Sequence, residues 1–172
     1  MAKPAVGRGV RGATAGRVEV PGRESEAAAR VGLVSCSAMA AIPEELVAVV
    51  VKDVSSRMEN PQYAQLAVGQ FVQAQPVVSQ YLSAKSEKLG GEGVIHTAFH
   101  GELLSECFRR YHAREELPVL GFEELDQASQ GDTAARFREL EPALADYVAS
   151  NVDDDEVKKV LALVAVALHQ SF

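Results

Sequence analysis

Residues 160–168 form an unbroken run of nine apolar residues, and this run limits the possible folds more than any other feature. Four acidic residues, 153–156, precede it, where the dipole at a helix N-terminus favours negative charge. The sequence therefore predicts a last helix, from 153 to about 170, that is apolar on nearly every side. Such a helix either lies at the centre of a bundle or forms half of a dimer interface. The run is about half as long as the ~18 apolar residues of a membrane span, so we expect no membrane-spanning segment.

Upstream of this run, apolar residues recur at helical spacing from Pro43 onward. Leu46, Val50, Val54 and Met58 are four residues apart and form one stripe. Strand signals are confined to short β-branched pieces within helical patterns, and the dipeptides typical of hairpins are missing. We therefore predict an all-α, compact bundle of about five to six helices, the longest clean one spanning 92–111. The helices are expected to be separated at Asn60–Pro61, at Pro76, at Gly90–Gly91 and by the connection 117–121.

Residues 1–40 differ from the rest of the chain in composition. They are rich in Ala, Gly, Arg and Ser and show no apolar period of 2 or 3.6 residues. We interpret 1–40 as a disordered N-terminal tail and 41–172 as a single helical domain. A second interpretation carries equal weight: Met39 stands just before the first helix, and the segment before it is an over-long reading of the gene.

A pattern of Phe, Pro and Tyr occurs twice, 66 residues apart. Phe71-x4-Pro76-x4-Tyr81 recurs as Phe137-x4-Pro142-x4-Tyr147, with Gln75 and Glu141 before the two prolines. One interpretation is a pseudo-twofold domain built from a duplicated helical unit, in which each proline begins a new helix. The other is that the two prolines are independent kinks in an Ala- and Val-rich chain.

Charge and composition narrow the classes of function. Residues 41–172 contain 11 basic and 21 acidic residues, a net charge of −10, which repels nucleic-acid phosphates and anionic membranes. Aromatic residues make up 6% of the chain and Trp is absent, which disfavours base-stacking platforms. Two cysteines, Cys36 and Cys107, do not suggest a disulfide framework. We expect a cytoplasmic protein that binds neither nucleic acid nor membranes.

His96 and His100 are the one pair of residues with a chemical interpretation. They are four residues apart, so their rings share a helix face, and the helical wheel places both in the apolar arc with Leu103 and Cys107. Two inward imidazoles one turn apart could bind a metal ion or haem, with further ligands from a facing helix. The competing interpretation, which we favour, is two partly buried histidines bonded to hydroxyls, carbonyls or water.

No common catalytic motif occurs, so we predict no catalytic residue and favour a protein that is not an enzyme. An enzyme site built from Glu102, Arg109 and Tyr111 has no positive signal in the sequence. The favoured hypothesis is a helical protein-interaction or regulatory module that binds a protein partner or self-associates into a homodimer. The alternative is a metal- or haem-binding protein that uses His96 and His100.

Overall fold

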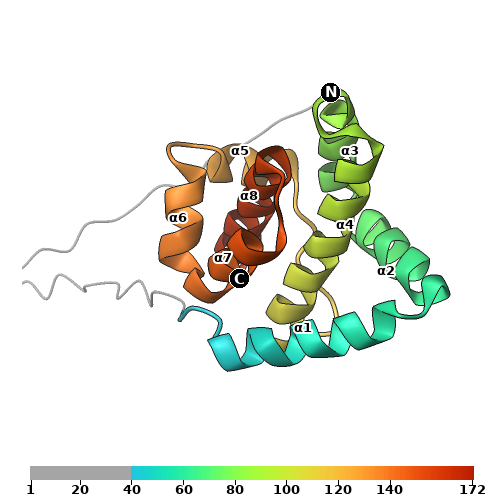
Figure 1. The fold of residues 1–172 in the computed structure, drawn as a ribbon. Helices are drawn as coiled ribbons and strands as arrows, with labels where there is room; N and C mark the ends of the chain where they lie inside the picture. Colours follow the sequence, from blue (N-terminus) through green and yellow to red (C-terminus); the bar gives the residue numbers. More distant parts are fainter. Residues whose placement is uncertain (1–39) are drawn as a thin grey trace, which may run out of the picture. The chain divides into compact units, whose positions relative to one another are not determined.

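The computed structural model describes residues 40–172, so all but Ala40 of the predicted tail, and Met39 as a start site, lie outside the described part. This part is all helical and contains no strand, which confirms the predicted fold class. The first four helices are α1 (Glu44–Met58), α2 (Pro61–Ala74), α3 (Pro76–Ala84) and α4 (Ser86–Tyr111). The last four are α5 (Phe122–Ala128), α6 (Thr133–Leu140), α7 (Pro142–Asn151) and α8 (Asp155–Ser171) (Figure 1).

The eight helices of the described residues exceed the predicted five to six because residues 122–151 form three separate helices, divided by residues 129–132 and by the joint at Pro142. Pro61, Pro76 and Pro142 each occupy the first turn of a helix, where the missing N–H of proline costs nothing. Gly90 interrupts α4 with φ 67° and ψ 172°, a conformation that side chains other than that of glycine rarely adopt.

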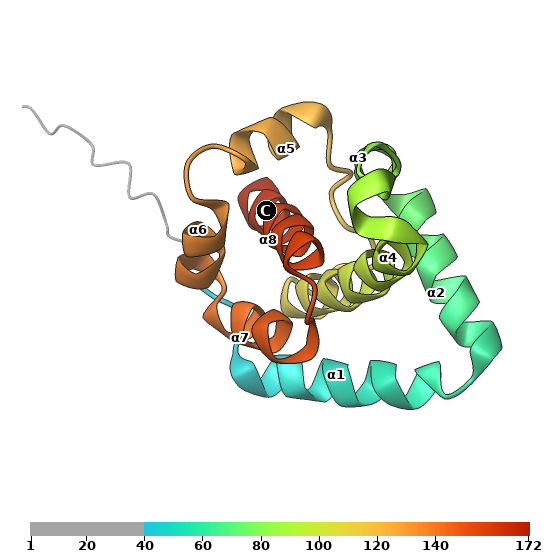
Figure 2. The ribbon, with the colours of Figure 1, turned by 45° about the horizontal axis from the view of Figure 1, so that its top comes forward.

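The apolar last helix lies at the centre of the bundle. In Figure 2, α8 is seen nearly end-on, with α4, α5, α6 and α7 around it, and all four pack against it. Every residue from Val160 to Leu168 is buried. Its first turn is capped by Asp154, whose carboxylate accepts hydrogen bonds from the backbone N–H groups of Glu156 and Val157 at 2.7 and 3.1 Å. Of the two predicted roles for this helix, the structure shows the central one.

The two proline joints have the same geometry. Gln75 and Glu141 end one helix and precede the proline of the next, with φ/ψ of −125°/69° and −136°/66°. The backbone N–H of each donates to the carbonyl oxygen of the phenylalanine four residues earlier, at 2.9 Å. The side chains of Gln75 and Glu141 are both buried. Two pairs of corresponding residues after the prolines are buried as well: Val78 with Leu144, and Leu82 with Val148. These likenesses favour a repeated unit, α2–α3–α4 and α6–α7–α8, over independent kinks.

Among residues 40–172, no helix combines the length and the apolar character that crossing a bilayer requires.

Candidate functional site

His100 is buried against α7 and is held by one polar contact. Its Nδ1 lies 2.9 Å from the hydroxyl oxygen of Tyr147, and the ring of Phe99 packs edge-on against it. Burial, followed by the nearby charge of His96, lowers the pKa of His100 to about 4. Burial raises the pKa of Tyr147 well above its usual range, so the phenol keeps its proton. At neutral pH His100 is therefore neutral and the phenol of Tyr147 is protonated, and one hydrogen bond joins the two groups.

His96 does not point inward, and the expectation of two inward histidines was wrong. Its side chain is 56% exposed, and its Nε2 lies 3.9 Å from a carboxylate oxygen of the exposed Glu92. The reason is the position of the helices around the first half of α4. They cover the side of Gly93, Thr97 and Ala98, so His96 stands at the edge of the covered arc. A helical wheel gives the angle between two residues but not which arc the neighbouring helices cover.

The two histidines nevertheless line one cavity, of about 350 Å³, between α4 and the start of α8. Glu92, Asp153 and Asp154 also line it. Within residues 40–172, however, no three His, Cys, Asp or Glu side chains are grouped closely enough to hold a metal ion. Cys107 offers no ligand here, because burial raises the pKa of its thiol to about 12. A metal at His96 and His100 stays a prediction.

An apolar groove borders the other side of His96. We call it the α2–α4 groove; it has a volume of about 490 Å³. Its wall residues come from the end of α1, from α2 and from α4, and they are Met58, Gln65, Val68, Ile95, His96 and Phe99. Ile95 is 58% exposed, although isoleucine is among the residues most often buried. His96 is the one titratable residue of this wall, so the groove presents an almost uncharged surface.

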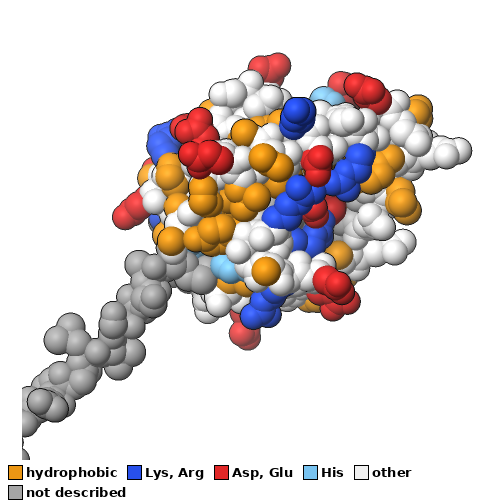
Figure 3. All heavy atoms as spheres, turned by 90° about the horizontal axis from the view of Figure 1, so that it is seen from below, with side chains coloured by type: hydrophobic (Ala, Val, Ile, Leu, Met, Phe, Trp, Pro, Cys, Tyr) orange, Lys and Arg blue, Asp and Glu red, His pale blue; other side chains and the backbone are white. Residues whose placement is uncertain are grey.

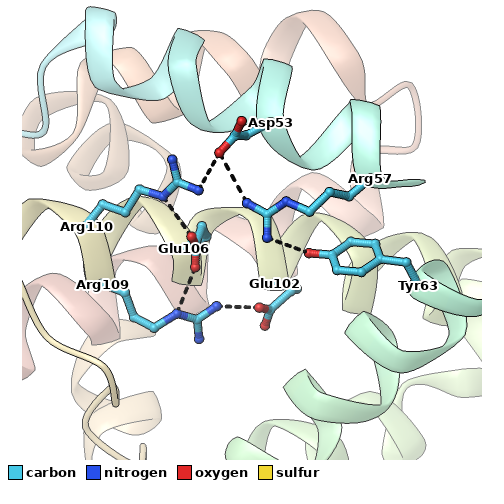
Figure 4. A network of polar contacts seen from close by, with 7 residues as sticks. All are labelled: Asp53, Arg57, Tyr63, Glu102, Glu106, Arg109 and Arg110. Carbon is cyan, nitrogen blue, oxygen red and sulfur yellow. Dashed lines mark hydrogen bonds and ion pairs between the residues drawn. The ribbon is translucent and has the colours of Figure 1, made fainter. Parts of the chain in front are cut away.

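A network of ion pairs and hydrogen bonds connects α4 to α1 and α2. Figure 3 shows basic and acidic side chains intermixed across one face of the molecule, and Figure 4 shows the network of contacts in detail. Arg110 pairs with Glu106 at 2.7 Å and with Asp53 of α1 at 2.8 Å. Arg57 extends the network to α2: it pairs with Asp53 at 3.2 Å and donates to the Tyr63 hydroxyl at 3.3 Å. Each acidic residue of this network, namely Asp53, Glu102 and Glu106, has a basic partner.

The part of this network that Glu102, Glu106 and Arg109 form is partly buried. Arg109 contacts both Glu102 and Glu106, the latter at 3.0 Å. Burial raises the pKa of Glu102, and the charge of Arg109 opposes that rise. Glu102 and Arg109, two of the three residues considered for an enzyme site, are therefore bonded to each other, and the geometry supports a structural role for both.

Sequence reasoning missed a second buried polar pair, Glu141 and His169. A carboxylate oxygen of Glu141 lies 2.8 Å from Nδ1 of His169, and the two side chains are 2% and 9% exposed. The position of Glu141 before Pro142, matched by Gln75 before Pro76, was the signal that could have drawn attention to it.

The sequence and the structure were compared with known proteins. No protein-family model, no curated protein and no solved structure matches this chain.

Proposed function

We propose that this protein is a non-enzymatic interaction module that self-associates through the α2–α4 groove. The observation that carries the proposal is the pairing of a hollow with a protruding side chain. Ile95 stands 58% exposed at the wall of an apolar groove large enough to accept such a side chain. Two copies related by a twofold axis could each insert Ile95 into the groove of the other, because a twofold contact brings the same surface of both subunits together.

The central helix does not contribute to this proposal. Its apolar surface is covered within the bundle, so an apolar contact between copies has to come from another surface, and the groove is one such surface. Charge also favours the groove. Residues 41–172 carry a net charge of −10, so two copies repel each other over most approaches. A nearly uncharged surface is where two acidic molecules can meet with the least repulsion.

The size of the groove suggests that association is weak. Burying an isoleucine contributes about 1.5–3 kcal/mol, hence about 3–6 kcal/mol for the two copies. Partial burial of Phe99 and Met58 adds to this. The loss of translational and rotational freedom opposes it with at least about 4 kcal/mol. The favourable terms exceed this loss by only a few kcal/mol, so we expect a dissociation constant on the order of 1 mM, rather than a permanent dimer.

Sedimentation equilibrium of the full chain, at concentrations from about 10 to about 500 µM (roughly half of that constant at the upper end), tests the proposal. The weight-average mass should rise with concentration for the wild type. Ile95→Asp should remove the rise, because it places a charge in the contact. Val49→Asp is the matched control: Val49 is 55% exposed on α1 and is not a wall residue of the groove. A mass that stays monomeric throughout, or that responds equally to both variants, would contradict the proposal.

A second candidate is a metal site at His96 and His100, favoured by the cavity that both side chains line with Glu92 and Asp153. In such a site Nδ1–H of His100 would donate to the Tyr147 hydroxyl oxygen, leaving Nε2 to the metal. Titration calorimetry with Zn²⁺ alone tests it. Binding that His96→Ala and His100→Ala each abolish would support the site, and heat that neither variant changes would rule it out.

A further inference from the structure

Gln75 and Glu141, the residues before the two prolines, each bind the segment that leads into a distant helix. The backbone N–H of Ile42, two residues before α1, donates to Oε2 of Glu141 at 2.8 Å. The backbone N–H of Leu120, two residues before α5, donates to Oε1 of Gln75 at 2.9 Å. Ile42 and Leu120 are both buried. We name these contacts the α1 latch and the α5 latch.

The two latches differ in the chemistry of the acceptor. Gln75 is an amide, which also donates from Nε2 to the carbonyl oxygen of Pro118 at 2.9 Å. An amide holds both a donor and an acceptor and does not titrate. Glu141 is a carboxylate, which only accepts when ionised, and its second oxygen lies 2.8 Å from Nδ1 of His169. The α1 latch therefore depends on where protons reside, and the α5 latch does not.

We propose that the α1 latch is a proton-sensitive release for the start of α1, while the α5 latch stays closed at the same pH. When His169 is protonated on both ring nitrogens, its Nδ1–H donates to Oε1 of Glu141. Protonation of Glu141 then turns one of its oxygens into a hydroxyl, which is a donor, so Nδ1–H and the N–H of Ile42 no longer both find an acceptor. Protonation of both Glu141 and His169 also leaves the charged imidazole buried without an anion beside it.

Few other titratable groups surround the latch. Cys107 of α4 lies close enough to Glu141 for the carboxylate to raise the pKa of its thiol, though burial is the larger cause. His112, at the end of α4, faces His169; burial is the first cause of its lowered pKa, followed by the charges of Arg114 and His169. The hydroxyl of Tyr147 on α7 is bonded to His100. The remaining charged residues next to the latch are exposed: Glu44 and Glu45 of α1 and Arg138 and Glu139 of α6.

The release is local. Val47, Val50 and Val54 are buried along α1, and they hold the rest of the helix against the bundle when the latch opens. Ile42 and Pro43 also line a cavity of about 630 Å³ between α1 and α7, together with Pro142. Opening the latch frees one wall of this cavity, so acidification widens an existing space rather than unfolding the domain.

Amide hydrogen exchange by NMR tests the proposal on the full wild-type chain, with Ile42 as reporter and Leu120 as internal control. Protection factors are measured at several pH values from about 7.5 down to about 4. Protection of Ile42 should fall about tenfold or more, the effect of losing a hydrogen bond to a charged group. Protection of Leu120 should stay within about twofold. An equal fall at both amides, or none at Ile42, would overturn the proposal.

Glu141→Gln gives the α1 latch the acceptor that the α5 latch has, and it should make the protection of Ile42 insensitive to pH. A pH-dependent fall that survives this substitution would place the sensitivity elsewhere. If the variant does not fold, the chemical shift of the Ile42 amide proton in the wild type gives a second measurement. A shift that changes with acidification while that of Leu120 does not supports the release, and an unchanged shift contradicts it.

Discussion

Replacing Gly101 with alanine tests how tightly α2 and α4 pack. A Cβ atom at Gly101 would lie 2.6 Å from Cζ of Phe71 and 3.0 Å from both Cε atoms. Carbon atoms pack at about 3.5–4.0 Å, so the overlap with Cζ is about 1 Å. Phe71 is buried and cannot swing into solvent. Overpacking of this kind costs about 1–3 kcal/mol, whereas the better helix propensity of alanine returns about 1 kcal/mol.

Gly69 in α2 provides the matched control. It is also a helical glycine, but a Cβ there would meet nothing within 4 Å. Gly69→Ala should therefore stabilise the protein by about 0.5–1 kcal/mol, while Gly101→Ala destabilises it by up to about 2 kcal/mol. Urea denaturation of the three proteins gives the free energies of unfolding. Opposite signs are expected, and a Gly101→Ala protein at least as stable as the wild type would refute the packing described for Phe71.

Three further outcomes follow from the structure. Because the pKa of His100 is lowered to about 4, the unfolded chain binds a proton at this residue at higher pH than the folded one. The free energy of unfolding should therefore fall by roughly 3 kcal/mol between about pH 6.5 and pH 4, a dependence that His100→Gln should flatten in urea titrations at several pH values. Arg109→Met leaves the partly buried Glu102 unpaired and should destabilise the protein by about 1–3 kcal/mol, measured against the exposed control Arg57→Met, whose effect should stay below about 1 kcal/mol. Self-association should strengthen between 50 mM and 500 mM NaCl in sedimentation experiments, since salt (Debye length roughly 14 Å and 4 Å) screens the repulsion between two acidic copies, and a weakening would indicate a contact made by ion pairs instead.

Much of the fold could be predicted from local pattern. The unbroken apolar run at 160–168 required a central position or a partner, and the bundle supplies the centre. Pro76 and Pro142 begin helices because proline tolerates the first turn and disfavours helical geometry in the residue before it. The positions of acids before α8 likewise predicted its start. In each case the cause lies within a few residues of its effect, which is why the sequence sufficed.

The misses concern contacts between residues far apart in the chain. Ile42 and Glu141 are 99 residues apart and Leu120 and Gln75 are 45 apart, so no local spacing connects them. The helical wheel predicted an inward His96 because it contains no information on which side of α4 the neighbouring helices lie. Nothing in the local sequence indicates that Glu102 lies partly buried, where its pairing with Arg109 offsets the loss of solvation.

A paramagnetic relaxation measurement addresses the self-association proposal most directly. A nitroxide is attached at Gln65→Cys, in the groove wall, in a Cys36→Ser background; the buried Cys107, whose pKa is about 12, stays unreactive. This protein is mixed with ¹⁵N-labelled chain without a spin label, so that broadening reports contact between copies. We expect broadening of the Ile95 and Phe99 amides and none at Asp126, which lies on α5. No intermolecular broadening at the concentrations where mass increases, or broadening centred away from the groove, would contradict association through the α2–α4 groove.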